Sequence, residues 1–290
     1  MAEYYNILQD EEELKWFFDH VIVEPTVDES YLVCISSRTK KLNEEEEKAL
    51  GLHKTEMLRK EICRRFQNTW NFDIYKQTFY KYNCDKRGFI APTGNPYFEK
   101  ALVCYTYVNP SSECKCIKDI LSYITDIMGD LIESNIKKSN GGVDDNLSKL
   151  GKVFGKFKSC HANNVSRVIW RDFDTDIKWS DIQEKLPDMT ETDINEFVRS
   201  KTNEFWGKGN AVIVRTAGGY HILIKKEVIN QNPMNFVNFI KDSYISDNIQ
   251  FSEFVKEMNL TQTGSQFLPT PGTIAYGERI IRVINKEDFD

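Results

Sequence analysis

The chain has no long apolar run and no excess of basic residues. These two absences limit the classes of protein to which it can belong. No stretch approaches the roughly 18 consecutive apolar residues of a membrane-spanning helix, and residues 1–5 lack the basic region and apolar core of a signal peptide. We therefore expect a protein of the cytoplasm, or of the host cytoplasm if it is viral, with no membrane partner. The net charge of −6 argues against a large duplex-binding surface but leaves room for a local basic groove.

Strong metal-binding patterns of cysteine and histidine are also missing. The seven cysteines are odd in number and follow no signal peptide, which indicates reduced thiols. Cys114 and Cys116 could surround a zinc ion together with Cys160 and His161, but their spacing is not CxxC and no second such pair follows. We therefore favour ordinary surface and core thiols and do not expect Zn²⁺ as a cofactor.

The composition is that of an ordinary globular protein. Of the 290 residues, 40% are hydrophobic and 28% charged, which suits a sizeable core in one large domain or two smaller ones. The polar, glycine-containing segment 137–150 indicates a linker or mobile loop. We therefore expect an N-terminal α/β sub-region over residues 1–136 and a second sub-region over residues 151–290.

Hydrophobic periodicity predicts helices and strands in both sub-regions. Helices are expected at 11–20, 43–66, 117–131, 178–186, 190–206, 236–244 and 252–258. Strands are expected at 31–35, 102–108, 165–173, 211–214, 220–224 and 280–284. The runs 211–214 and 220–224 are joined by a glycine-containing turn and form a predicted β-hairpin. The pattern favours an α/β (α+β) protein whose second sub-region is a mostly antiparallel sheet with helices.

Two carboxylates stand out at the end of the apolar run 165–173. Asp172 and Asp174 are two residues apart, so on a strand they share one face. Two close carboxylates near a core are costly unless cations lie between them, and Mg²⁺ and Mn²⁺ prefer oxygen ligands. The alternative is that the strand ends at residue 172 and both acids are solvated.

The predicted hairpin carries a second polar group. Thr216, Gly218 and Gly219 could cradle phosphates with hydroxyl and backbone N–H groups, since glycine lets the backbone approach closely. Arg215 could add positive charge, and His221 could direct a ring N–H at an anion. The alternative is a satisfied histidine beside an ordinary turn. Arg38, Lys40 and Lys41 follow the strand at 31–35 and form either a solvated loop or a phosphate-contacting one.

Together these two stretches resemble the archaeo-eukaryotic primase superfamily, which includes primase-polymerases of phages and plasmids. The resemblance lies in the apolar-x-Asp-x-Asp pattern and in a small, glycine-rich stretch that leads to an apolar-flanked histidine about fifty residues later. Residues 268–273 resemble a Pro-Gly-Ser/Thr segment near the end of some members, and residues 36–38 and 107–111 look similar to stretches of phage-encoded members. The resemblance is specific over residues 165–225.

The resemblance implies roles for these residues. Asp172 and Asp174 would hold catalytic divalent metals, Mg²⁺ or Mn²⁺. Thr216, Gly218, Gly219 and His221 would bind the triphosphate of the incoming nucleotide. A third metal-binding acid is expected before the final strand, with Asp247, Glu253 and Glu257 as candidates; the distance from Glu257 to Pro271-Gly272 is about that expected. Arg38, Lys40 and Lys41 would contact phosphates or the template.

The implied function is that of a DNA primase or primase-polymerase, a nucleotidyltransferase that adds nucleoside triphosphates on a single-stranded DNA template. Its second sub-region would be the RRM-like (RNA-recognition-motif-like) part of a primase catalytic core, and a replicative helicase is a candidate partner. Such a chain would be of viral or mobile-element origin. Two alternatives stay open: a metal-dependent nuclease or nucleotide hydrolase at the same acids, and a non-catalytic nucleic-acid- or protein-binding module on a degenerate primase fold.

Overall fold

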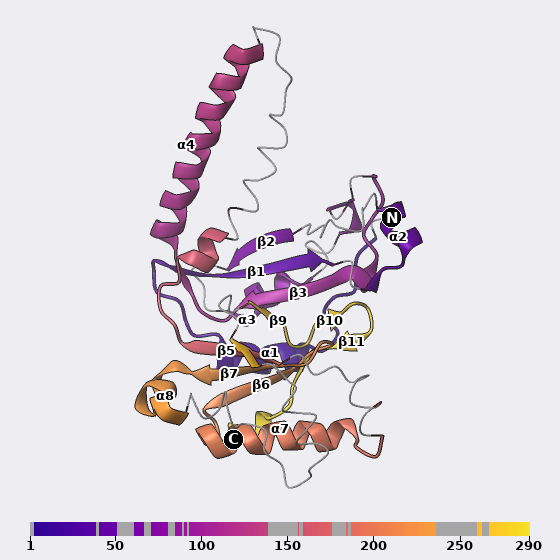
Figure 1. Cartoon of the computed structure of the whole chain (residues 1–290), viewed down its shortest axis with the longest axis vertical. Helices are drawn as coiled ribbons and strands as arrows, with labels where there is room; N and C mark the ends of the chain where they lie inside the picture. The colour runs from indigo at the N-terminus through magenta and orange to yellow at the C-terminus, as the bar shows by residue number, and fades with distance from the viewer. Residues whose placement is uncertain are drawn as a thin grey trace.

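The fold is built from two mostly antiparallel sheets that share one core (Figure 1). The computed structural model describes residues 3–38, 41–50, 61–66, 71–80, 85–88, 90–91, 93–138, 156, 159–175, 184, 187–235, 260–262 and 267–290. Over these residues the protein is of the α+β class, with several helices around the two sheets.

The first sheet has the strand order β2-β1-β3-β9, with β4 also paired to β1. Its strands are β1 (Glu29–Ser37), β2 (Glu61–Phe66), β3 (Leu102–Tyr107), β4 (Ser111–Ser112) and β9 (Phe267–Pro269). Every residue of β1 and β3 is buried, as expected for central strands covered on both faces. Strand β9 comes from near the C-terminus and pairs with β3, so residues far apart in the sequence complete this sheet.

The second sheet has the order β12-β6-β7-β5-β8. Its strands are β5 (Trp170–Thr175), β6 (Ala211–Arg215), β7 (Tyr220–Lys225), β8 (Leu260–Gln262) and β12 (Arg282–Val283). Helix α7 (Glu191–Trp206) covers one face, where Phe173 and Ile222 pack against Ile194. Because side chains alternate along a strand, Asp172 and Asp174 lie on the opposite face with Trp170, which belongs to the core shared with the first sheet.

Helix α1 (Glu11–Val21) is tied to the segment between β9 and β10. The N–H groups of Gln9 and Asp10 donate to the Gly272 carbonyl at 2.9 and 3.0 Å. Gly272 has a φ of +82°, and a Cβ there would lie 2.3 Å from the Asp10 carbonyl oxygen. Only glycine allows this close approach, which explains one residue of the segment 268–273 in structural terms.

The remaining elements lie around the sheets. They are α2 (Glu44–Ala49), α3 (Phe72–Gln77), α4 (Glu113–Lys138), α8 (Lys226–Gln231), the hairpin β10 (Ile274–Ala275) and β11 (Arg279–Ile280), and 3₁₀ turns at Lys86–Gly88, Glu99–Ala101 and Lys286–Asp288. Helix α4 projects away from both sheets (Figure 1). In the part of the chain that the structure describes, no helix combines the length and apolar character needed to cross a membrane.

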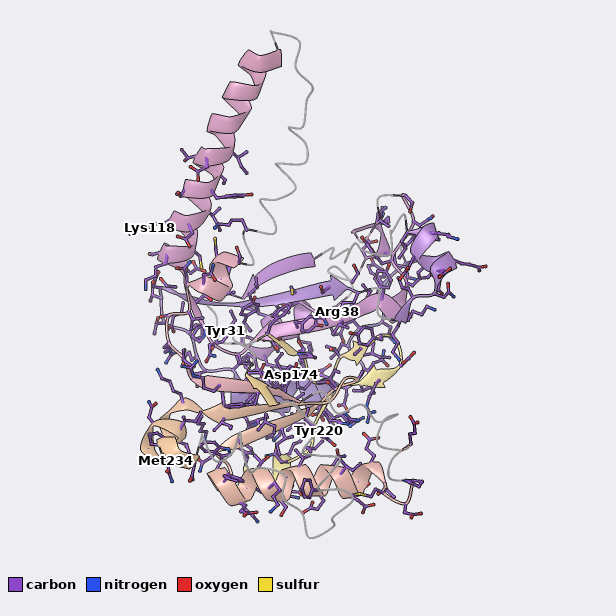
Figure 2. All side chains as sticks on the ribbon, in the orientation of Figure 1. Tyr31, Arg38, Lys118, Asp174, Tyr220 and Met234 are labelled. Atoms are coloured by element: carbon purple, nitrogen blue, oxygen red, sulfur yellow. The ribbon has the colours of Figure 1, made fainter. Side chains whose placement is uncertain are left out.

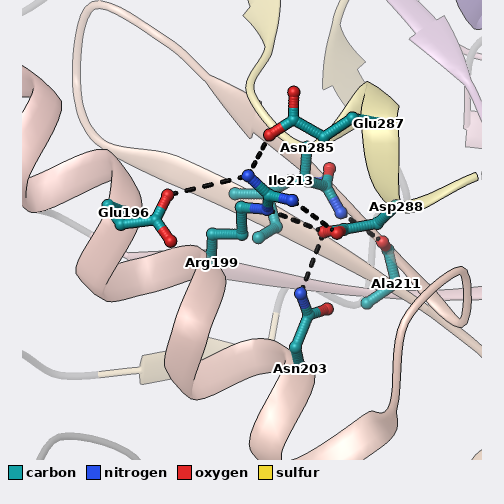
Figure 3. Close-up of polar contacts among 8 residues, drawn as sticks. All are labelled: Glu196, Arg199, Asn203, Ala211, Ile213, Asn285, Glu287 and Asp288. Carbon is teal, nitrogen blue, oxygen red and sulfur yellow. Dashed lines mark hydrogen bonds and ion pairs between the residues drawn. The ribbon is translucent and has the colours of Figure 1, made fainter.

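A polar network joins the C-terminal segment to α7 and β6 (Figure 3). The side chain of Asn285 accepts from Ile213 N–H and donates to the Ala211 carbonyl, at 2.9 and 2.8 Å. Arg199 of α7 forms a two-point contact with Asp288 at 2.7 and 3.0 Å. The network holds the edge strand β12 against β6 and fixes the end of the chain on the helix.

Several predicted elements need correction. The predicted helix 43–66 is wrong at its end: the helix spans only Glu44–Ala49 with Asn43 in a capping box, and residues 61–66 form β2. Residues Ile62 and Phe66 match a helical period, but pairing with β1 overrides that local pattern. The strand predicted at 165–173 begins at Trp170 and continues to Thr175, so both acids lie inside the strand rather than at its end. The strand predicted at 280–284 is divided into β11 and β12.

Other predictions agree with the structure or fall outside it. The helices at 11–20 and 190–206, the strands at 31–35 and 102–108, and the hairpin 211–224 are confirmed. The helix predicted at 117–131 is longer, running from Glu113 to Lys138. The predicted helices 236–244 and 252–258, most of 178–186 and residues 139–150 of the predicted linker lie outside the described residues.

Candidate active site

A cavity of about 300 Å³ lies between the two sheets and gathers residues from three separately predicted segments. Its polar lining consists of Arg38, Lys41, Asp174, Thr216, Gly218 and His221. Arg38 follows β1 of the first sheet, whereas Asp174 belongs to β5 of the second (Figure 2). His221 belongs to β7 of the second sheet. The shared core of the two sheets therefore places cationic and acidic groups around one volume.

His221 connects the two predicted acids. Its register partner on β5 is Asp174, and Asp172 is two residues away on the same face. The ring Nδ1 lies 3.0 and 3.2 Å from the two carboxylate oxygens of Asp172, and Nε2 lies 3.7 Å from Asp174 Oδ1. A carboxylate can only accept a hydrogen bond, so Nδ1 donates to Asp172. The three side chains thus form one contiguous polar group.

The two acids differ in their access to the cavity. The Asp172 side chain is 0% exposed, whereas that of Asp174 is 41% exposed and lines the cavity. Burial disfavours the charged form of His221, but the charges of Asp172 and Asp174 and the hydrogen bond to Asp172 outweigh burial and raise the pKa of His221 above its usual value. The charge of Arg38 acts weakly in the opposite direction.

The turn between β6 and β7 is held by its own hydrogen bonds. The Thr216 N–H donates to the Gly219 carbonyl at 2.8 Å, and the Thr216 hydroxyl donates to the same oxygen at 3.1 Å. The Gly218 N–H donates to the Thr216 hydroxyl at 3.2 Å. Thr216, Ala217 and Gly218 line the cavity, but Gly219 is not among its lining residues and closes the turn instead.

Arg215 does not line the cavity. Its buried guanidinium lies 4.8 Å over the Tyr220 ring, donates to the Gly219 carbonyl at 3.1 Å and lies 3.4 Å from Glu191. Glu191 also forms an ion pair with Arg279 of β11. Burial lowers the pKa of Arg215. The residue was predicted to bind phosphate, but these contacts make it an anchor for the turn.

Two cations face the cavity from the first sheet and the segment after it. The Arg38 guanidinium lies 5.2 Å over the Tyr105 ring, and its Nε is buried with no hydrogen-bond partner in the structure as described. Lys41 pairs with Glu278 at 2.9 Å. A buried N–H without a partner is costly, so Arg38 is suited to receive an anion. Lys40 lies outside the described residues.

Two of the predicted metal ligands are present in the described structure. Asp172 and Asp174 supply carboxylate oxygens, which fit Mg²⁺ or Mn²⁺ in kind. All three candidates for the third acid, Asp247, Glu253 and Glu257, lie outside the described residues. Within the described ranges, no group of three or more His, Cys, Asp and Glu side chains is arranged to hold a metal ion. The donors described here are therefore two acids with a histidine between them.

Some residues that build the site carry no sequence signal of their own. Tyr105, Phe267 and Tyr276 form part of the cavity wall, and only the pairing of β3 with β9 brings the first two together. Asn109 fixes the start of β5: its Oδ1 accepts from the N–H groups of Ile169 and Trp170 at 2.6 and 2.9 Å. Its Nδ2 donates to the Trp170 carbonyl at 2.9 Å. The sequence marks residues 107–111 only by their resemblance to phage-encoded members and does not predict the contact of Asn109 with the acid-bearing strand.

Comparison with protein-family models, with curated proteins and with solved structures finds no match for this chain. The site is accordingly defined by the geometry of its own residues. That geometry consists of an acidic pair bridged by His221, a glycine turn, and two cations across a shared cavity.

Proposed function

We propose that this protein is a metal-dependent nucleotidyltransferase of the primase or primase-polymerase type, which adds nucleotides on a single-stranded DNA template. One observation carries the proposal. Asp174 and His221, the Thr216–Gly218 turn, and Arg38 with Lys41 come from distant parts of the chain and line one cavity. An acidic edge beside a cationic wall suits a metal-bound triphosphate, which needs oxygen ligands for the cation and positive charge for its outer phosphates.

The arrangement of the second sheet supports the same class. Its strands are antiparallel, α7 covers one face, and both acids project from the other face. An RRM-like sheet in a primase core would present its catalytic acids in this way, from the face that its helices do not cover. The first sheet then supplies the opposite wall, through Arg38 and β3.

Asp172 and Asp174 are the residues that would hold the divalent cations, together with an acid from residues 236–259, which the structure does not describe and for which Glu257 is our candidate. Bound cations of this kind neutralise phosphate charge and lower the pKa of an attacking hydroxyl. Asp174 is the acid with direct access to the cavity. Asp172 orients the His221 ring through Nδ1, which leaves Nε2 toward Asp174.

The other residues would bind and orient the triphosphate. Arg38 has an unused buried donor, and Lys41 can exchange its ion pair with Glu278 for a phosphate oxygen. The Thr216–Gly218 turn would restrict the position of the phosphates. Positioning and charge neutralisation are the main contributions a protein makes to phosphoryl transfer.

The proposal is tested by extension of a primed single-stranded DNA template with labelled dNTPs or NTPs and Mg²⁺ or Mn²⁺. We expect extension by the wild type and none by Asp174→Asn. The matched control is Glu204→Gln, which removes an exposed acid of α7 paired with Lys201, remote from the cavity. Extension that persists in Asp174→Asn overturns the proposed site. Template degradation in place of extension would identify a nuclease, and nucleotide binding without either reaction would identify a non-catalytic module.

A further inference from the structure

Tyr276 has a backbone conformation that is unusual for its residue type. Among the residues that the structure describes, it is the only non-glycine residue with a positive φ, at 57°. L-residues with large side chains rarely adopt this left-handed region, because Cβ approaches the backbone. The local sequence does not favour this conformation for a tyrosine, so tertiary contacts must stabilise it.

The strained residue lies in the turn between β10 and β11. The Glu278 N–H donates to the Ala275 carbonyl at 3.1 Å, and the two central residues, Tyr276 and Gly277, have φ values of 57° and 66°. Two positive φ values define a type I′ turn, in which Asn-Gly is the favoured central pair. Gly277 matches that preference and Tyr276 does not. The Tyr276 N–H donates to the Leu102 carbonyl at 2.9 Å, which helps to hold the turn in place.

The strained turn carries the tyrosine into the wall of the proposed active site. Tyr276 is 8% exposed, belongs to the core shared by the two sheets and lines the cavity, as do the apolar residues Val103 and Ile281. Tyr105 and Phe267, which also line the cavity, are stacked on each other, with 4.3 Å between ring centroids and 17° between ring planes. In the described structure the Tyr276 ring has no such aromatic partner. Strain of this kind is kept where the surrounding structure needs the side chain in one place.

We propose that Tyr276 contacts the nucleoside of the bound nucleotide, with its ring stacked on the base. The inference rests on the proposed function, since it divides the same cavity into two parts. Arg38 and Lys41 suit the anionic phosphates, whereas the Tyr276 ring, with the apolar side chains of Val103 and Ile281 in the same lining, suits a flat aromatic base. Tyr276 is thereby a specificity-determining residue: its ring favours binding of nucleotides over binding of simple polyphosphates.

Binding measurements on the full chain test this subsite with two variants. Tyr276→Asn deletes the ring but keeps the turn, because Asn is well suited to a positive φ. Tyr276→Phe keeps the ring. In calorimetric titrations with Mg²⁺, we expect Tyr276→Asn to bind dATP roughly tenfold more weakly, as loss of one base–aromatic stack implies, with unchanged affinity for inorganic tripolyphosphate. Tyr276→Phe should bind both within about twofold of wild type, since stacking needs no hydroxyl. Equal losses for both ligands, or no loss for dATP, would overturn the proposal.

A ligand-side comparison does not depend on any variant folding. Wild-type protein is titrated with dATP and with ribose 5-triphosphate, which lacks the base. We expect the abasic compound to bind roughly tenfold more weakly than dATP and close to tripolyphosphate. Equal affinity for dATP and the abasic compound overturns the subsite. The proposed function is tested separately by Asp174→Asn in the extension assay, so the two can fail independently.

Discussion

His221 Nδ1 lies 3.0 Å from an oxygen of Asp172, and this contact joins the two parts of the proposed active site. Asp172 is on β5 and His221 is on β7, 49 residues later. The pairing of β5 with β7 sets their register, with Asp174 opposite His221. The two acids also differ in their surroundings. Asp172 is fully buried and accepts the hydrogen bond from His221, while Asp174 lines the cavity.

The first prediction concerns the charge of Asp172. Asp172→Asn keeps the side-chain shape and an oxygen that can accept from His221, but it removes the negative charge. If Asp172 holds a cation as well as the histidine, nucleotide incorporation should fall by roughly 100-fold or more. Incorporation is measured by primer extension, with circular dichroism to confirm folding. Wild-type rates in this variant would show that Asp172 acts only by orienting His221.

The second prediction compares Arg38, which lines the cavity, with the buried Arg215. Arg38→Gln should weaken binding of tripolyphosphate roughly tenfold, because it removes a cation with an unused donor in the cavity. Arg215→Gln should change that affinity less and lower the thermal midpoint more, because Arg215 contacts Gly219, Glu191 and Tyr220 outside the cavity. Titration calorimetry and thermal melting of both variants check this pattern. The opposite ranking would assign phosphate binding to Arg215.

The third prediction concerns glycine in the segment between β9 and β10. Gly272→Ala should destabilise the protein by about 2 kcal/mol or more, since its Cβ would lie 2.3 Å from the Asp10 carbonyl oxygen and φ is +82°. Gly129→Ala is the control: it lies in α4 with no atom within 4 Å of the added Cβ, and it should stabilise by about 0.5–1 kcal/mol. Urea unfolding measures both. Equal, small effects would show that the approach of Gly272 to α1 is not as close as described.

The fourth prediction concerns pH and the contact between Arg199 and Asp288 (Figure 3). Burial alone would raise the pKa of Asp288, but hydrogen bonds from Arg199 and Asn203 outweigh it, so the pKa is lower than usual. A lowered carboxyl pKa contributes stability that is present above the unfolded-state value, about 4, and is lost as pH falls through the folded value. Asp288→Asn should therefore lower the thermal midpoint at pH 7, and the difference from wild type should shrink toward pH 3. A difference that is constant over this range would contradict an ionic contribution.

Part of the site follows from the chain alone. Alternation along a strand is enough to place Asp172 and Asp174 on one face, and the apolar runs on either side of the glycine turn are enough to predict the hairpin that presents His221. Both depend on neighbours in sequence, where local steric preferences act. The capped helix starts at Asn43 and Thr190 were predictable for the same reason.

Only the tertiary structure decided the rest. Residues 61–66 have a helical period but pair with β1, since a strand edge beside them offers more hydrogen bonds and burial than an isolated helix. Arg215 looks like a phosphate ligand in the sequence, yet the ring of Tyr220 and the carboxylate of Glu191 hold it outside the cavity. The cavity itself depends on two contacts with β3: the pairing of β9, which brings in Phe267, and the bond from the Tyr276 N–H to the Leu102 carbonyl. The pairing of β3 with β9 joins residues more than a hundred positions apart, and a local pattern carries no information on which distant strand will be the partner.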